Sequence, residues 1–184
     1  MSKTWEIAPK KSDDLVTQLL FNRGIRTEKE IEKLFYPKLE DFEKDLEIPG
    51  IAKAKKRIEK AIKEGELIII YGDYDADGLC GAAIMYLGLT FLGAKVLPYI
   101  PHREKEGYGL SKTGLDFVKG KGATLVITVD NGIIALEQAE YASKIGLDLI
   151  ITDHHLPTDT LPKALAIVHS TKFCGAGVTW CLAR

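Results

Sequence analysis

The chain has little cysteine, no long apolar run and almost no net charge. Its three cysteines, Cys80, Cys174 and Cys181, are an odd number and lack the CxxC spacing of zinc and redox centres. We therefore predict free thiols in a reducing compartment, the cytoplasm. No stretch approaches ~20 consecutive apolar residues, so we expect no membrane-spanning segment and no membrane partner.

The charges are nearly balanced, with 25 lysines and arginines against 26 acids in 184 residues. A protein that binds nucleic acid by electrostatic attraction alone is usually basic. If this chain handles nucleic acid, bound metal ions or another domain must supply positive charge. The length is sufficient for one well-buried domain with a small appendage.

The sequence divides into a small helical leader, residues 1–50, and an α/β domain, residues 51–184. Capping residues predict short leader helices that begin near Ser12 and Thr27. The spacing of apolar residues then predicts an amphipathic helix at 51–64.

From Leu67 onward, strand and helix signals alternate. The strand runs are continuously apolar, which indicates burial on both faces, and the strand–helix–strand order implies parallel pairing. We predict an α/β fold, a parallel five-stranded sheet with helices on both faces. The predicted strands are 67–72, 95–100, 124–129, 147–152 and 164–168, and the predicted helices are 78–92, 111–119, 133–145 and 176 to the end.

Short clusters of acids follow three of these strands. They are Asp73-Tyr-Asp75-Ala-Asp77, Asp130-Asn-Gly and Asp153-His154-His155. The carboxyl ends of parallel strands face one crevice, so these side chains are expected to converge. Carboxylates that converge repel one another unless cations lie between them. The pattern therefore predicts a two-metal site.

Other interpretations of the first two clusters are weaker. The first cluster resembles the start of a calcium-binding loop, D-x-D-x-D-G, but the twelfth position, which requires Glu, is Ile84. A plain turn would not need three alternating carboxylates. Asp130-Asn-Gly by itself fits a turn as well as a site, and its position after a strand favours the site.

The pair His154-His155 is the strongest single signal. Adjacent histidines point in different directions, so one can bind a metal while the other faces the substrate. The carboxylate of Asp153 beside them is typical of a group that orients a ligating histidine. An oxygen-rich ligand set with one or two nitrogens favours Mn²⁺ or Mg²⁺ over structural zinc.

Residues 101–111, between the second and third predicted strands, contain two glycines around Tyr108. We expect a mobile loop near the crevice, in which the guanidinium of Arg103 could hold a phosphate. On composition alone, an ordinary charged surface loop is an equal alternative.

Together, Asp75-Ala-Asp77-Gly, Asp130-Asn-Gly and Asp153-His-His155 resemble the motifs of the DHH phosphoesterase superfamily. The segments Tyr71–Gly78, Tyr99–Arg103 and Cys174–Val178 are most similar to its branch of exonucleases specific for single-stranded DNA. The resemblance implies 5′-to-3′ removal of nucleotides from single-stranded DNA in repair and recombination, with two Mn²⁺ or Mg²⁺ ions. It also implies a single-strand-binding protein or other repair proteins as partners.

The resemblance implies a role for each site residue. His155 would contact the scissile phosphate and Asp73 would support the catalytic group, while Arg103 and His102 would bind a substrate phosphate. The metal ligands would be Asp75, Asp77, Asp130 and His154.

The sequence departs from the superfamily pattern in two places. His169-Ser170 stands where the family usually has Asn-Pro, and no Asp or Glu follows Asp159, although the family has a further metal-binding aspartate beyond the Gly-Ala-Gly-Val segment. We therefore expect a chain truncated before the last metal ligand and the second domain, with reduced activity or none by itself.

Three other functions fit part of the pattern. A DHH phosphoesterase for oligonucleotides, cyclic dinucleotides or pyrophosphate is disfavoured by the segment 103–110 and the helical leader. A non-catalytic DHH scaffold is disfavoured because all three acidic clusters are intact. A phosphate-receiver domain also has acids at strand ends, but it has no place for Asp153-His-His155.

Overall fold

The computed structural model describes residues 4, 6–38, 40–42 and 46–184. The chain forms two compact units, Met1–Lys44 and Asp45–Arg184. The predicted leader, residues 1–50, includes eight residues that lie outside the described part of the chain, namely 1–3, 5, 39 and 43–45.

The first unit contains two short helices, α1 (Leu15–Asn22) and α2 (Glu28–Phe35). Asp14 caps α1 by accepting the amide of Thr17 at 2.7 Å. Thr27 and Glu30 form a reciprocal capping box at the start of α2. Both helices were predicted, α2 from this capping box and α1 from a cap at Ser12, whereas the structure places the cap of α1 at Asp14.

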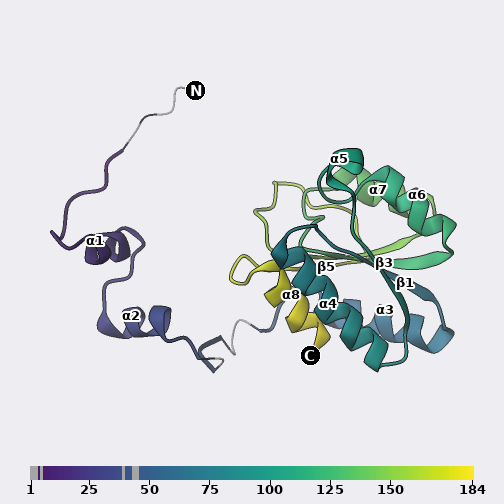
Figure 1. Ribbon diagram of the computed structural model, residues 1–184, viewed down its shortest axis with the longest axis horizontal. Coiled ribbons are helices and arrows are strands. Elements are labelled where there is room, and N and C mark those ends of the chain that lie inside the picture. The colour runs from purple at the N-terminus through teal and green to yellow at the C-terminus, as the bar shows by residue number, and fades with distance from the viewer. Residues whose placement is uncertain (1–3, 5, 39, 43–45) are drawn as a thin grey trace. The chain divides into compact units, whose positions relative to one another are not determined.

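The second unit contains a parallel five-stranded sheet, as the sequence predicts (Figure 1). The strand order is β2-β1-β3-β4-β5, so the chain turns to opposite sides of β1 to form β2 and β3. Open α/β sheets bind ligands at such a reversal. The strands are β1 (Leu67–Tyr71), β2 (Lys95–Tyr99), β3 (Ala123–Val129), β4 (Asp148–Asp153) and β5 (Ala166–His169).

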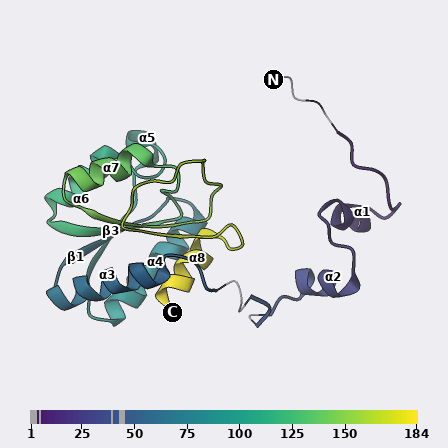
Figure 2. The same cartoon turned by 180° about the vertical axis from the view of Figure 1, so that it is seen from behind.

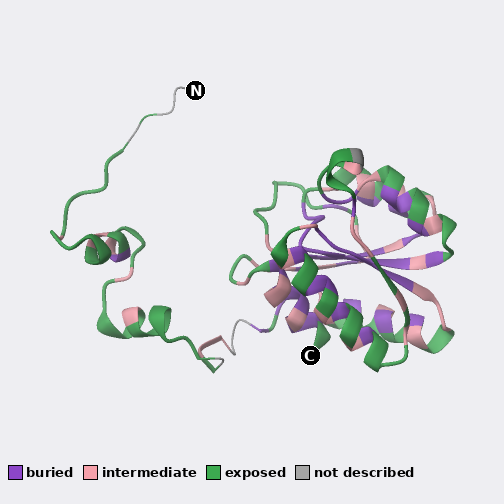
Figure 3. Ribbon diagram, viewed as in Figure 1, coloured by how far each residue is buried: buried purple, intermediate pink, exposed green. Residues whose placement is uncertain are grey.

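Helices cover both faces of the sheet (Figures 1 and 2). Side chains of β1 alternate between two apolar clusters, with Ile68 and Ile70 in one and Ile69 and Tyr71 in the other. The central strands are therefore buried on both sides (Figure 3). One face packs against α3 (Ile51–Glu64), α4 (Ala76–Phe91) and α8 (Gly175–Ala183), and the other against α6 (Lys112–Gly120) and α7 (Leu136–Lys144).

Two expectations about secondary structure were wrong. The strand β2 is mostly exposed, with Leu97 48% exposed, because it lies at the edge of the sheet and only one neighbouring strand covers it. A short helix, α5 (Arg103–Glu106), lies in the segment predicted as a loop. Four residues are too few to show the apolar periodicity from which a helix is predicted.

Several predicted boundaries shift by two or three residues. The helix α4 begins at Ala76 because the Asp75 carboxylate accepts the amide of Gly78 at 2.9 Å and so caps it. This places Asp77 in the first turn of α4. The strand β4 extends to Asp153, whose carboxylate is therefore fixed by the sheet rather than by a loop.

All three cysteines are free thiols, with Cys80 and Cys174 exposed and Cys181 buried. Among the helices that the structure describes, none has both the length and the apolar character needed to cross a bilayer.

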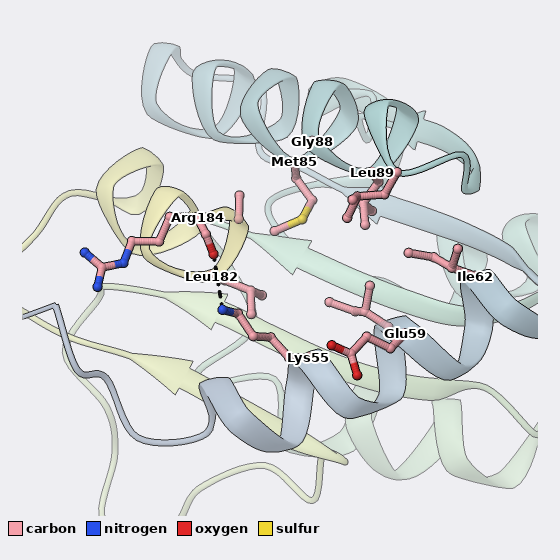
Figure 4. A pocket seen from close by; sticks show the side chains of 11 residues that line it. Lys55, Glu59, Ile62, Met85, Gly88, Leu89, Leu182 and Arg184 are labelled. Atoms are coloured by element: carbon pink, nitrogen blue, oxygen red, sulfur yellow. Dashed lines mark hydrogen bonds between the residues drawn. The ribbon is translucent and has the colours of Figure 1, made fainter.

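A pocket of about 300 Å³ lies between α3, α4 and α8 (Figure 4). Its wall is mostly apolar, from Ile62, Met85 and Leu182, and Lys55 Nζ donates a hydrogen bond across its edge to the backbone oxygen of Arg184 at 3.1 Å. None of the predicted site residues lines this pocket.

Candidate metal centre

The three acidic clusters meet at the carboxyl end of the sheet. Carboxylate oxygens of Asp73, Asp75 and Asp130 lie within 4.8 Å of one another. Ligand atoms of Asp130, His154 and His155 also lie within 4.8 Å of one another. Asp130 belongs to both groups and is therefore the centre of the cluster. This convergence follows from the parallel strands β1, β3 and β4, which end at the same edge.

The backbone holds the side chain of Asp130 in an unusual position. Asp130 follows β3 directly and has φ +63°, the left-handed region that few residues other than glycine adopt. Its side chain is 1% exposed, and its Oδ1 has no hydrogen-bond partner in the part of the chain that the structure describes. His154 Nε2 lies 3.1 Å from this oxygen. A buried carboxylate oxygen without a partner is costly unless a ligand satisfies it.

Gly175 makes room for this carboxylate. A Cβ atom at Gly175 would lie 2.4 Å from Asp130 Oδ1, closer than any non-bonded contact allows. Sequence patterns pointed to this glycine only through the family resemblance of the Gly-Ala-Gly-Val segment. Its physical reason, the close approach of a carboxylate from a distant strand, is visible only in the structure.

Asp77 joins two helices at the edge of the cluster. Its oxygens accept the amides of Gly175 at 2.5 Å and Ala176 at 2.7 Å, so the carboxylate caps α8. His154 Nε2 lies 3.6 Å from Asp77 Oδ2. Burial disfavours the ionised form, but the amides of Ala176 and Gly175, the Cys174 thiol and His154 together lower the pKa of Asp77. Each oxygen keeps a lone pair for a metal ion.

Asp73 and Asp75 approach Asp130 from the turn after β1. Asp73 is 2% exposed, and its Oδ1 accepts the amide of the next residue, Tyr74, at 2.7 Å. Burial and the charge of Asp75 raise the pKa of Asp73. Asp75 is exposed at the start of α4, where one of its oxygens caps the helix.

Asp153 orients both histidines. Its Oδ1 accepts the amides of His154 at 2.7 Å and His155 at 3.1 Å and lies 2.8 Å from His155 Nδ1. Its Oδ2 accepts the amide of Ile133 at 2.9 Å. The carboxylate can only accept, so Nδ1 of His155 carries the proton and Nε2 is free to accept. Burial opposes protonation of His155, but Asp153, Asp130 and Asp73 outweigh it and raise its pKa.

Tyr108 also reaches the cluster, which the sequence did not indicate beyond the two glycines beside it. Its Oη lies 3.4 Å from His155 Nε2 and 3.5 Å from the backbone oxygen of Asp130. The ring packs edge-on against Tyr74, with the centroids 6.4 Å apart. Burial and the charges of the neighbouring carboxylates raise the pKa of Tyr108. The hydroxyl therefore stays protonated and can donate.

Arg103 and His102, the predicted phosphate-binding residues, lie at the periphery. Arg103 Cζ is 5.1 Å from the centre of the Tyr74 ring, and Tyr74 follows Asp73 directly. His102 is exposed, and its amide donates to Glu106 at 2.9 Å. The structure thus brings six predicted residues into one cluster and places these two beside it, without a direct contact to the carboxylates.

The cluster has an excess of negative charge. Five aspartates gather here, and no arginine in the described part of the chain pairs with them; the side chains that lie beside them are the imidazoles of His154 and His155. Burial and the charges of Asp77 and Asp75 raise the pKa of Asp130 to about 7. The five aspartates are Asp73, Asp75, Asp77, Asp130 and Asp153.

This donor set fits divalent metal ions. Carboxylate oxygens with imidazole nitrogens are ligands for Mn²⁺, and mainly oxygen ligands suit Mg²⁺. The observation that supports the fit is the buried Asp130 carboxylate, which is shared by two groups of donors and whose Oδ1 has no hydrogen-bond partner among the described residues.

The comparison with known protein families agrees with this geometry. The family model described as "DHH family, N-terminal domain" matches residues 67–183, which contain the whole sheet and every site residue. The chain therefore belongs to the DHH family.

Similar proteins come from the exonuclease branch that the motifs indicate. The single-stranded-DNA-specific exonuclease RecJ of Bacillus subtilis (strain 168) is 45% identical over 155 residues, 84% of this chain and 20% of that protein. RecJ of Escherichia coli (strain K12) is 36% identical over 184 residues, 95% of this chain and 31% of that protein. The chain thus spans less than a third of the length of these relatives.

A solved structure shares the fold. The crystal structure of exonuclease RecJ bound to manganese matches with a TM-score of 0.68 and 39% identity, over 74% of this chain and 37% of that one. The predicted α/β architecture is confirmed by this similarity.

Proposed function

We propose that this chain is the metal-binding domain of a RecJ-like exonuclease that hydrolyses phosphodiester bonds in single-stranded DNA. The observation that carries the proposal is the buried Asp130 carboxylate, whose Oδ1 has no hydrogen-bond partner among the described residues and which belongs both to the group with Asp73 and Asp75 and to the group with the two histidines. The family match and the manganese bound to a related RecJ support it.

Two ions, Mn²⁺ or Mg²⁺, would be held by Asp75, Asp77, Asp130 and His154. When bound, such a pair of ions activates a water molecule and neutralises charge on the phosphate. The chain provides the remaining functions itself. Asp153 fixes the orientation of the His155 ring through Nδ1, and Nε2, which lies beside the Tyr108 hydroxyl, would contact the scissile phosphate.

The other predicted residues would act around this centre. Asp73 would support the metal ligands, since one of its carboxylate oxygens lies within 4.8 Å of those of Asp75 and Asp130. Arg103, held over Tyr74, and His102 would bind a phosphate of the strand. We propose 5′-to-3′ polarity, a role in DNA repair and recombination, and repair proteins such as a single-strand-binding protein as partners. The free thiols support the reducing cytoplasm as its location.

Metal binding is the first test. Calorimetric titration of the metal-free chain with Mn²⁺ should show two sites, and Asp130→Ala or Asp75→Ala should remove at least one. Absence of Mn²⁺ binding by the unmodified chain would contradict the proposal and favour a non-catalytic scaffold.

Hydrolysis is the second test. A 5′-labelled single strand should lose its label as mononucleotide with Mn²⁺ and stay intact with a chelator. Faster cleavage of dinucleotides than of long strands would assign the site to small substrates instead, and unchanged turnover in Asp130→Ala would refute the assignment of the site.

A further inference from the structure

The segment that carries Tyr108 is held at both ends by tyrosine hydroxyls. We define the Tyr108 loop as residues 101–111, which run from the end of β2 to the start of α6. The loop begins two residues after Tyr99 and ends beside Tyr71. These two tyrosines are the last residues of β2 and β1, are paired in the sheet, and have ring centroids 4.8 Å apart.

Tyr99 holds the first half of the loop. Its hydroxyl donates to Glu106 Oε2, while Glu106 Oε1 accepts the amide of His102 at 2.9 Å. One carboxylate therefore closes the single turn of α5 and ties it to the end of β2. A helix of four residues has little stability of its own, so this tie determines where the turn lies.

Tyr71 holds the other end. Its hydroxyl lies 3.3 Å from Ser111 Oγ and accepts the amide of Ser111 at 3.4 Å. Ser111 in turn caps α6 by accepting the amide of Gly114 at 2.9 Å. Tyr71 is fully buried, so its hydroxyl is a fixed point.

Between these two ties, Tyr108 lies over the cluster. The glycines on either side, Gly107 and Gly109, have φ of +82° and +71°, a conformation that turns the chain sharply and that side chains rarely adopt. The hydroxyl of Tyr108 lies near His155 Nε2 and the Asp130 backbone oxygen, and its ring packs edge-on against Tyr74 and His155. Because the two glycines leave the backbone free to turn here, the position of Tyr108 depends on these contacts and on where the rest of the loop is anchored, which includes its two ends and the buried Leu110.

We propose that Tyr71 and Tyr99 are positioning residues that hold the Tyr108 hydroxyl against His155. The loop then keeps His155 Nε2 in one orientation toward the substrate. The kinetic part of this inference rests on the proposed function, whereas the contact between Tyr108 and His155 does not.

The test uses tyrosine-to-phenylalanine variants, which keep the ring and remove only the hydroxyl. The variants are Tyr99→Phe, Tyr71→Phe and Tyr108→Phe. Tyr141→Phe is the matched control, because its hydroxyl also donates to a carboxylate, Asp116, at 2.6 Å, but between α7 and α6.

The first measurement is the ¹H–¹⁵N spectrum of the imidazole rings in metal-free protein without DNA. We expect Tyr99→Phe and Tyr71→Phe to move the His155 ring signals in the same direction as Tyr108→Phe, and Tyr141→Phe to leave them in place. Unmoved His155 signals in Tyr99→Phe and Tyr71→Phe would overturn the proposal, whether or not the chain is a nuclease.

The second measurement is a double-mutant cycle on Mn²⁺-dependent hydrolysis. We expect Tyr99→Phe to lower kcat by roughly 3- to 10-fold, as the loss of one hydrogen bond allows, with a smaller change in KM. The double variant with Tyr108→Phe should be no slower than Tyr108→Phe alone, because both act through one contact. Losses that multiply would show that Tyr99 acts on the fold and not through Tyr108.

Two substitutions at Glu106 distinguish loss of its hydrogen bond with Tyr99 from loss of its negative charge. Glu106→Gln can still accept the His102 amide and donate to the Tyr99 oxygen, so we expect near-normal His155 signals and kcat. Glu106→Ala should resemble Tyr99→Phe. If both Glu106 variants changed the His155 signals and kcat equally, the proposed role of the hydrogen bond between Tyr99 and Glu106 would be contradicted. If no variant, including the unmodified chain, hydrolyses DNA while the His155 signals shift as expected, the positioning role stands and the proposed function fails.

Discussion

Charged side chains are paired at the amino end of the sheet, whereas carboxylates are in excess at its carboxyl end. At the amino end, Arg57 donates to Glu66 at 2.6 Å and to Asp148 at 2.6 Å, and the Thr124 hydroxyl also donates to Glu66. Every charge in this network has a partner, and the Arg57 side chain is only 10% exposed. At the carboxyl end, five aspartates share two imidazoles, and a buried oxygen of Asp130 has no hydrogen-bond partner among the described residues.

This difference separates a structural network from a functional one. The guanidinium of Arg57, on α3, binds two carboxylates, Glu66 just before β1 and Asp148 at the start of β4, and so fixes α3 against the starts of these two strands. The carboxyl end concentrates like charges, which costs stability in the metal-free protein and creates affinity for cations. Functional sites commonly carry such a cost. Substitutions at the two ends should therefore have opposite effects on stability and on metal binding.

Asp130→Asn should have the largest effect. Asn has the same shape and tolerates the same backbone conformation, but it removes the central charge. We expect Mn²⁺-dependent hydrolysis to fall by roughly 1,000-fold and the metal-free protein to gain about 1 kcal/mol of unfolding free energy. Calorimetry with Mn²⁺, a turnover assay and urea unfolding measure these changes. Asp148→Asn, at the amino end of the sheet, is the control. If both variants lost Mn²⁺ affinity equally, the two ends of the sheet would not differ in function.

Arg57→Ala should have the opposite pattern. It leaves Glu66, whose side chain is 15% exposed, without its partner, so we expect the unfolding free energy to fall by about 3 kcal/mol. Mn²⁺ affinity of the folded protein should not change. Lys60→Ala, which removes an exposed pair with Glu64 at 3.9 Å, should cost at most about 0.5 kcal/mol. An Arg57→Ala protein as stable as Lys60→Ala would show that the amino-end network is not structural.

Gly175→Ala tests whether the Asp130 carboxylate needs the space that the missing side chain of Gly175 leaves. Because the added Cβ would overlap Asp130 Oδ1, we expect Mn²⁺ affinity to fall roughly 10-fold and stability to fall by about 1–2 kcal/mol. Gly88→Ala is the control in another apolar helix, since its Cβ would lie 3.8 Å from its nearest neighbour, Ala183. That change should be neutral or stabilise α4 by up to about 1 kcal/mol. Normal Mn²⁺ binding by Gly175→Ala would mean that Asp130 can move without loss.

The smallest expected effect is the dependence of the unfolding free energy on acidic pH through Glu66, at the amino end of the sheet. Hydrogen bonds from Arg57 and Thr124 outweigh burial and lower the pKa of Glu66 in the folded protein. Its contribution to stability is therefore complete above the ordinary carboxyl pKa of about 4.3 and is lost as the pH falls through the lower, folded value. Glu66→Gln should lose stability less steeply than the unmodified chain in urea unfolding below about pH 4.3. Parallel pH curves for the two proteins would exclude this contribution.

Much of the fold could be predicted because its signals are local. Buried strands such as Ile68–Tyr71 are continuously apolar, and turns and caps separate them from helices. The edge position of β2 was missed, although its sequence, Lys95-Val-Leu-Pro98-Tyr99, contains a lysine and a proline, which are typical of edge strands. The helix α5 is too short to have a periodicity, and its place is fixed by a side-chain contact, from the Tyr99 hydroxyl to Glu106, that a pattern of apolar residues does not reveal.

The sequence by itself determined that carboxylates and histidines follow parallel strands, and hence that they meet at one edge of the sheet. Residue type and order along the chain are sufficient for this, because strand ends in a parallel sheet must share a side. Only the tertiary structure decided that Asp130 is the centre, that Asp77 caps α8, that Gly175 leaves room for a carboxylate and that Tyr108 reaches His155. These contacts join residues far apart in the chain, and such contacts leave no periodic pattern in the sequence.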